Sequence, residues 1–309
     1  MTRSPSLPWL VMLAALAAGS ARGASPAPRD PLTPFWAAIV TDDAERTAGW
    51  YQSALGFKRF HAMEFPEAKV KVLLLERDCF NLEVIGGPSF VRAEDLDPRA
   101  ADPDLRQGIV KLSFRTADIR TLSEILRQKG AVFLVNPSRD PTFGDTFNLF
   151  KDPDGNLLQL FQPPDRRARR LGDRLEAGVF ALIVADLDAA AAWYARHLGF
   201  RVERRVEAAE AGVRVAFLDR DGFTLELIAK RGTVSVKEKQ KAAKPETMVR
   251  GYLKLGFLVR DLDAWARRFS GAGVAFKIPI TADKPTGTRF FLVEDNEGNV
   301  LQLFEKVKP

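Results

Sequence analysis

Short apolar runs alternate with amphipathic segments from residue 36 onwards. The run Trp36 to Val40 is apolar throughout, which predicts a buried strand. From Ala44 to Leu55 the large apolar side chains recur at helical spacing, with Asp43 as a suitable N-cap and Gly56 as a suitable C-cap. Three more strands are expected at residues 57–65, 70–75 and 79–85. The unit is therefore one strand, one helix and three strands.

The same order of elements follows after a loop at residues 86–106. A strand is predicted at 109–114, a helix at 119–128 that ends before Gly130, and strands at 132–135, 146–150 and 157–161. Asp152-Pro153-Asp154-Gly155 is a turn sequence between the last two strands. The pattern is thus two βαβββ modules. Its antiparallel runs of strands indicate the α+β class rather than strict α/β alternation.

Both modules are repeated later in the chain, and the matched positions need no insertion or deletion to align. Trp50-Tyr51 returns 143 residues later as Trp193-Tyr194, and Leu158 to Phe161 returns at the same step as Leu301 to Phe304. A period this long exceeds that of solenoid repeats, so the duplicated unit is a whole domain. The sequence predicts a first domain at 32–164, a linker at 165–175 and a second domain at 176–307, with four modules in total.

The first 23 residues have the pattern of a signal peptide. Arg3 precedes an apolar run from Leu7 to Ala18, and small residues lead to Gly23. The run is shorter than the ~20 residues that a membrane-spanning helix needs. We therefore expect cleavage near Gly23, a periplasmic or secreted protein and no stable membrane insertion afterwards; an uncleaved anchor is the alternative.

Charge and cysteine content narrow the function classes. The net charge is +6, and basic residues gather at 166–170 and 237–244 without interleaved aromatic residues. Such runs are typical of solvated linkers or loops, so no nucleic-acid partner is expected. Cys79 is the only cysteine, so no intramolecular disulfide can form. Its place in an apolar strand pattern predicts a small buried thiol.

The helix motif Trp50-Tyr51 with Leu55-Gly56-Phe57, together with the closing Asp152-Pro153-Asp154-Gly155-Asn156, resembles the vicinal oxygen chelate superfamily. That superfamily includes glyoxalase I, bleomycin-resistance proteins and extradiol dioxygenases. The resemblance covers nearly all of the chain after residue 32. It implies an α+β fold of four βαβββ modules in two tandem glyoxalase-like domains, each an open half-barrel sheet with helices outside.

The resemblance also implies where metal ligands would lie, on the first and last strands of each module. The first-strand positions are Trp36, Lys111, Val179 and Lys254, and the last-strand positions are Glu83, Gln159, Glu226 and Gln302. If modules pair within a copy, one cavity holds Trp36, Glu83, Lys111 and Gln159, and the other holds Val179, Glu226, Lys254 and Gln302. Pairing across the copies is the alternative, and it too gives each cavity one Glu, one Lys and one Gln.

These residues depart from a metal-binding set. A divalent cation in such a fold needs three or four His or carboxylate ligands. Each cavity instead offers one carboxylate, one amide and one lysine ammonium, which repels a cation. The two histidines, His61 and His197, are not at ligand positions. We therefore expect no metal and no other cofactor. The hypothesis is that Glu83–Lys111 and Glu226–Lys254 form ion pairs against which a polar ligand group docks; the alternative places both lysines on a solvent-exposed rim.

Four repeated aromatic residues have less specific interpretations. Tyr51 and Tyr194 lie on apolar helix faces and are expected in the core. Phe147 and Phe290 either line the cavity or pack beneath it.

Three functions remain open. The first is an exported, metal-independent binding protein for a small organic ligand, like the bleomycin-resistance branch. The second is a lyase, isomerase or dioxygenase of the superfamily, with or without metal, in which Glu83 or Glu226 acts as the general base. The third is a non-catalytic scaffold. The expected partner is a small molecule, and the sequence leaves a homodimer open.

Overall fold

The computed structural model describes residues 30–140, 144–244 and 247–307. The predicted signal peptide at 1–23 lies outside the described residues. In the ranges that are described, every helix is too short or too polar to cross a membrane.

The chain is built from four βαβββ modules, as the pattern predicts. The strands of the first two modules are β1 (Thr33–Thr41), β2 (Lys58–Phe65), β3 (Val70–Arg77), β4 (Phe80–Gly86), β5 (Gly108–Arg115), β6 (Val132–Arg139), β7 (Thr146–Lys151) and β8 (Leu157–Gln162). Those of the last two are β9 (Glu176–Ile183), β10 (Arg201–Ala208), β11 (Val213–Arg220), β12 (Phe223–Lys230), β13 (Gly251–Leu258), β14 (Phe276–Asp283), β15 (Thr288–Glu294) and β16 (Val300–Lys306).

Each module carries its own helix. These are α2 (Ala44–Leu55), α4 (Ile119–Gln128), α6 (Leu187–Leu198) and α8 (Leu262–Gly271). Within the described ranges, three shorter α-helices lie in the connections between modules: α3 (Ala93–Leu96), α5 (Asp165–Leu171) and α7 (Val236–Ala243). The predicted bounds of α2 and α4 are confirmed to the residue, because Asp43 and Asp118 cap their first turns through side-chain oxygens.

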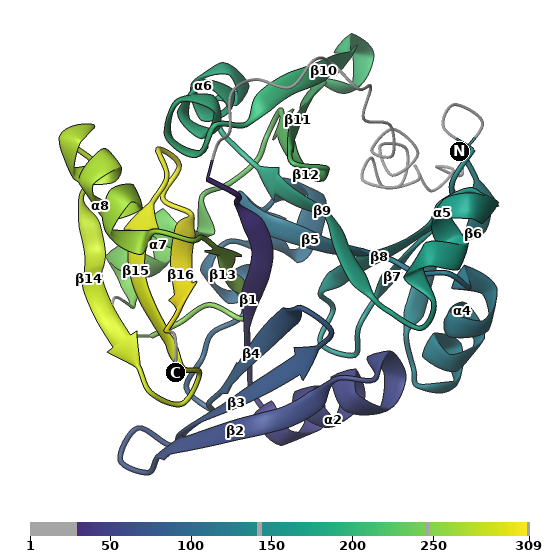
Figure 1. Cartoon of the computed structure of the whole chain (residues 1–309), viewed down its shortest axis with the longest axis horizontal. Coiled ribbons are helices and arrows are strands. Elements are labelled where there is room, and N and C mark those ends of the chain that lie inside the picture. Colours follow the sequence, from purple (N-terminus) through teal and green to yellow (C-terminus); the bar gives the residue numbers. More distant parts are fainter. Residues whose placement is uncertain (1–29, 141–143, 245–246, 308–309) are drawn as a thin grey trace.

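The modules assemble into two curled sheets of eight strands, and each sheet takes one module from each copy (Figure 1). Sheet 1 has the order β14-β15-β16-β13-β1-β4-β3-β2, and sheet 2 has the order β10-β11-β12-β9-β5-β8-β7-β6. The seam of each sheet is an antiparallel pair of first strands, β1 with β13 and β5 with β9. Of the two arrangements that the sequence left open, pairing across the copies is the one observed.

The helices pack on one face of each sheet and leave the other face to the strands alone. In β1, Ala37 and Ile39 belong to a large core that also contains Trp50 and Tyr51 of α2. Trp36, Ala38 and Val40 alternate with them and belong to a separate cluster on the opposite face. We call this opposite face the inner face of the sheet. One continuous core therefore joins the helices to both sheets, and two smaller clusters fill the inner faces.

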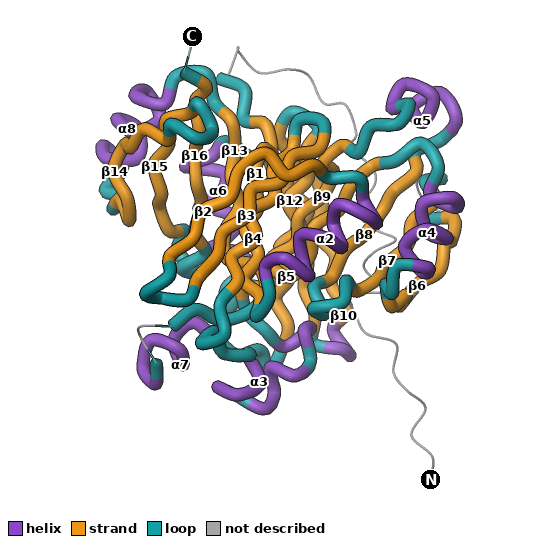
Figure 2. The backbone as a smooth tube through the Cα atoms, turned by 90° about the horizontal axis from the view of Figure 1, so that it is seen from below, coloured by secondary structure: helices purple, strands orange, loops and turns teal. Residues whose placement is uncertain are grey.

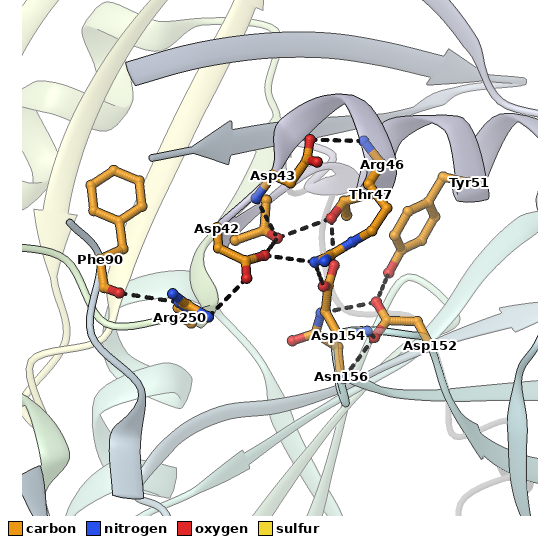
Figure 3. Close-up of polar contacts among 11 residues, drawn as sticks. Asp42, Asp43, Arg46, Thr47, Tyr51, Phe90, Asp152, Asp154, Asn156 and Arg250 are labelled. Carbon is orange, nitrogen blue, oxygen red and sulfur yellow. Dashed lines mark hydrogen bonds and ion pairs between the residues drawn. The ribbon is translucent and has the colours of Figure 1, made fainter. Parts of the chain in front are cut away.

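A buried polar network ties the closing turn of the second module to the helix of the first (Figure 3). The Tyr51 hydroxyl donates to Asp152, and the Thr47 hydroxyl donates to Asp154. The side chain of Asp152 also accepts from Asn156, which shapes the turn. Burial nevertheless raises the pKa of the Asp152 carboxyl to about 6. The second copy repeats the motif, with Tyr194 donating to Asp295 at 2.8 Å. The prediction that both tyrosines belong to the core is confirmed.

Three local details differ from the predictions. The basic runs do lie in connections between modules, but they form the short helices α5 and α7 there rather than irregular loops, because alanines within the runs permit helix and Ser235 caps α7. Cys79 is exposed rather than buried. It lies in the tight turn between β3 and β4, just after Asp78, whose φ of 55° marks a left-handed turn residue. Strand β4 therefore begins at Phe80, one residue later than the pattern predicts.

Candidate ligand-binding site

The strand registers bring the eight predicted positions to the inner faces in two separate groups. In sheet 1, Ala38 of β1 lies between Glu83 on β4 and Lys254 on β13. Two residues further along the strands, and so on the same face, Gly256 lies between Trp36 and Gln302. In sheet 2 the equivalent group comprises Lys111, Gln159, Val179 and Glu226. Each group draws on both copies.

The group on sheet 1 is centred on Glu83. Its Oε2 accepts from Trp36 Nε1 at 3.0 Å and lies 2.8 Å from Lys254 Nζ. The side chains of Lys254 and Glu83 keep 12% and 15% of their exposure, so solvent reaches the ion pair. Trp36 also stacks on Phe304, with the ring centroids 5.0 Å apart. The result is a partly open polar pair beside an aromatic surface.

The group on sheet 2 is closed. Lys111 Nζ lies 2.8 Å from Glu226 Oε2, and both side chains are fully buried. Val179, Phe147 and Phe217 are among the buried apolar residues that fill this inner face. The second carboxylate oxygen, Glu226 Oε1, accepts no hydrogen bond from the described part of the chain. The Lys111–Glu226 ion pair is therefore enclosed in an apolar cluster without access to solvent.

The predicted ion-pair partners were wrong, although the residue types were right. Glu83–Lys111 and Glu226–Lys254 do not form; the observed pairs are Glu83–Lys254 and Lys111–Glu226. The reason is the seam between first strands, which places each lysine beside the glutamate of the other copy. The alternative of a solvent-exposed rim is also wrong, most clearly for Lys111.

Two exchanges between the copies distinguish the inner faces, and sequence reasoning missed the one at Gly256. Trp36 faces Gly256 across the seam of sheet 1, whereas Val179 faces Ser113 at the equivalent place in sheet 2. A Cβ at position 256 would meet the Cβ of Trp36 at 2.5 Å and the ring of Phe304 at 2.6 Å. Glycine is therefore what allows the stacked rings to sit here. The signal was present in the repeat, where Lys111-Leu112-Ser113 becomes Lys254-Leu255-Gly256.

The exchange at Gly256 leaves the two glutamines in different states. Gln159 Oε1 accepts from the Ser113 hydroxyl at 3.2 Å. Gln302 has glycine where that serine would be, and its Oε1 is buried without a hydrogen-bond donor in the described ranges. A buried acceptor without a donor costs on the order of 1–3 kcal/mol. Gln302 is therefore ready to accept a hydrogen bond from a group that is not part of the sheet.

The remaining candidate residues are two phenylalanines and two histidines. Phe147 is buried in the inner face of sheet 2, and Phe290 is half-buried on the inner face of sheet 1. His61 lies on β2 and His197 in α6. The His197 ring stacks on Phe269, and burial lowers its pKa. Neither histidine belongs to the two inner-face groups.

The residues present do not fit the divalent metal that glyoxalase chemistry implies. Each inner face offers one carboxylate, and in both groups a lysine ammonium 2.8 Å away already neutralises it. Such a cation needs several anionic or imidazole donors and no competing positive charge. Across the described ranges, His, Cys, Asp and Glu form no cluster of three that could hold a metal ion.

Comparison with known proteins identifies the family. The model of the Glyoxalase/Bleomycin resistance protein/Dioxygenase superfamily matches residues 33–160 and 177–303. The chain belongs to this superfamily, and the resemblance seen in the sequence is confirmed together with the fold it implies. The match covers both tandem copies, so all four modules are accounted for.

Named relatives include lactoylglutathione lyases from plants. Lactoylglutathione lyase GLX1 of Arabidopsis thaliana is 27% identical over 169 residues, or 54% of this chain and 55% of that protein. A putative lactoylglutathione lyase of Brassica oleracea var. gemmifera is 26% identical over 171 residues, with the same two shares. The alignments thus span about half the length of these curated relatives.

Solved structures support the fold over nearly the whole chain. Glyoxalase I from Zea mays superposes with a TM-score of 0.63 at 18% identity and covers 89% of this chain and 93% of its own. A putative dioxygenase from Bacillus subtilis subsp. subtilis str. 168 gives 0.59 at 11% identity, with 90% and 86% covered. At such identities the likeness concerns the fold alone.

The buried ion pair of sheet 2 gives a first prediction. Lys111→Met leaves Glu226 charged and unpaired in an apolar cluster, which should lower the free energy of unfolding by about 3–5 kcal/mol. The double variant Lys111→Met/Glu226→Leu should recover most of this loss. Urea denaturation measures all three. Lys254→Met is the matched control and should cost much less, because solvent and Trp36 still reach Glu83. Equal costs for the two single variants would contradict this description.

The seam glycine gives a second prediction. Gly256→Ala forces a Cβ against the Trp36 Cβ and should destabilise the protein by about 1–3 kcal/mol, as overpacking does. Gly49→Ala is the control, because Gly49 lies inside α2 with nothing within 4 Å of an added Cβ. It should instead stabilise the protein by about 0.5–1 kcal/mol. Thermal and urea unfolding test both; a neutral Gly256→Ala would contradict the close approach.

Proposed function

We propose that this protein binds a small organic molecule on the inner face of sheet 1, without a catalytic metal. The observation that carries the proposal is the buried Gln302 Oε1, which has no hydrogen-bond donor among the residues that the structure describes and lies next to an ion pair that solvent still reaches. Around it lie Trp36, Phe290 and Phe304, whose rings offer apolar contact area. Apolar walls with a few convergent polar groups are typical of ligand sites.

The expected ligand follows from these groups. It carries an N–H or O–H donor for Gln302 Oε1 and an apolar or aromatic body for the rings. The Glu83–Lys254 pair offers it one acceptor and one donor on the neighbouring row of the sheet. Sheet 2 presents the equivalent groups in a closed apolar cluster. We assign Lys111, Gln159, Val179 and Glu226 a structural role.

The cellular location belongs to the same proposal. The positive residue, apolar run and small residues of positions 1–23 support export with cleavage near Gly23. The mature protein would then meet its ligand in the periplasm or outside the cell.

An enzymatic function is the second candidate, and the names of the plant relatives favour it. Of the two predicted general bases, Glu226 is sealed from solvent, whereas Glu83 is partly exposed. An acid–base reaction without metal would therefore use Glu83 beside Lys254 on sheet 1.

Ligand-observed NMR with indole and N-methylindole tests the binding proposal. Indole has an N–H group that can donate a hydrogen bond to Gln302 Oε1. N-methylindole has the same rings without this donor. We expect indole to bind the wild type more tightly by about tenfold, a difference of about 1.4 kcal/mol. Gln302→Leu should remove this preference, whereas Gln159→Leu, the equivalent change on sheet 2, should preserve it.

The same preparations distinguish the alternatives. Protein from the exported fraction should begin at Ala24 and contain less than stoichiometric iron, zinc, nickel or manganese. It should not turn over methylglyoxal with glutathione, nor catechol. Stoichiometric metal or turnover abolished by Glu83→Gln would replace the binding proposal by the enzymatic one. Equal responses of Gln302→Leu and Gln159→Leu would show that the ligand does not use sheet 1.

A further inference from the structure

A cavity of about 370 Å³ lies at a place separate from both inner-face groups. Its lining includes residues of α3 and α7. These two helices lie at the same end of the molecule (Figure 2). The first residues of β5 and β13 and the turns before β8 and β16 form its walls, and α7 covers one side. Its size is in the range of small-molecule sites. Trp36, Glu83, Lys254 and Gln302 are not among its lining residues.

The cavity lies where the two copies meet. Gly108 and Gly251, which are equivalent in the repeat, both line it, and so do Asn156 and Asn299. An added Cβ on Gly108 would lie 3.6 Å from Asn299 Oδ1, and one on Gly251 would lie 3.8 Å from Asn156 Oδ1. Each copy thus faces the other across the cavity, and the backbone walls are nearly symmetric.

The charges on the walls are not symmetric. Among the described residues, five basic side chains line the cavity, namely Arg106, Lys237, Lys241, Arg250 and Lys277, against one acidic side chain, Glu297. The Glu297 carboxylate is already used, because it accepts from the backbone N–H groups of Ala185 and Asp186. At the repeat step, Lys237, Lys241 and Arg250 correspond to Glu94, Pro98 and Gln107. The fold itself therefore does not require this positive charge.

Neighbouring carboxylates compensate only part of it. Lys237 and Lys277 share a single acidic partner, Glu294. Arg250 pairs with Asp42, as Figure 3 shows. Arg106 reaches Glu94 only at 3.5 Å. No ion pair is formed by Lys241 with any carboxylate in the described ranges. The cavity therefore keeps an excess of positive charge that favours an anion.

Part of the lining is apolar, and we call this part the floor of the cavity. It comprises Val110, Leu157, Val249, Leu253 and Val300. The hydroxyl of Tyr252, another lining residue, donates to the Leu157 carbonyl at 2.8 Å. A bare inorganic anion would leave this surface unused. The walls instead match a molecule with an anionic group at one end and an apolar body at the other.

We propose that this cavity is a second binding site, for an amphipathic organic anion such as an aromatic sulfonate or a carboxylate with a hydrocarbon body. Lys241 on α7 attracts the anionic group, and the apolar floor at the start of β5 and β13 receives the body. The site is independent of the ligand proposed for sheet 1.

Two fluorescent dyes test the proposal on the full chain. Anilinonaphthalene sulfonate has the anionic group, and phenylnaphthylamine has the same rings without it. We expect one sulfonate dye to bind per chain, about tenfold more tightly than the neutral dye and more weakly as salt rises. Lys241→Glu should weaken the sulfonate dye about tenfold or more. Lys244→Glu makes the same charge change near the end of the helix, outside the lining, and should change binding less than about twofold.

The outcomes separate this site from the other proposal. Gln302→Leu should leave the sulfonate dye unaffected; if it abolishes binding, the dye occupies sheet 1 and the second site is wrong. Equal affinity for both dyes, or equal loss in Lys241→Glu and Lys244→Glu, would also overturn it. Circular dichroism and thermal unfolding establish that each variant is folded. Lys241→Gln, which removes only one charge, should lie between the wild type and Lys241→Glu.

Discussion

The antiparallel seam between first strands of different copies is the constraint on which the rest of the structure depends. Because β1 pairs with β13 and β5 pairs with β9, each sheet needs a module from both copies. The seam determines which lysine pairs with which glutamate, and it places Gly256 against Trp36. It also brings the starts of β5 and β13 together at the cavity between the copies. A change at the seam would therefore alter every site described above.

Duplication gave two inner faces with the same polar residues, and packing has made them different. In sheet 2 a valine and a serine meet at the seam, the serine satisfies the glutamine, and apolar side chains seal the ion pair. In sheet 1 a tryptophan and a glycine meet there, and the glutamine Oε1 has no donor within the described part of the chain. A sealed ion pair contributes little binding surface, whereas an ion pair that solvent reaches, beside the acceptor Gln302 Oε1, is suited to recognition. In our proposal, the exchange of Val179 and Ser113 for Trp36 and Gly256 is what distinguishes the ligand-binding face from the structural one.

Much of the fold could be predicted from sequence because its signals are local. Helix α2 begins after a capping aspartate and ends at a left-handed glycine, so its bounds followed from the caps. The polar residues of the site could be located because the resemblance to the vicinal oxygen chelate superfamily implies positions on the first and last strands of each module. Their partners could not, because Glu83 is equally compatible with Lys111 and Lys254 until the sheet order is known. Cys79 shows the limit at strand ends, where a turn residue continues the apolar pattern. The cavity between the copies could not be predicted either, because no local sequence pattern indicates how segments of the two copies pack against each other.

The most direct test of this account is a measurement of backbone proton contacts across the seams by NMR. The structure predicts nuclear Overhauser effects between Ala38 and Lys254 and between Lys111 and Ala181, which face each other in the two antiparallel pairs. Contacts of β1 with β5 and of β9 with β13 in place of these would mean that modules pair within a copy. That result would contradict the observed ion pairs and the account built on them.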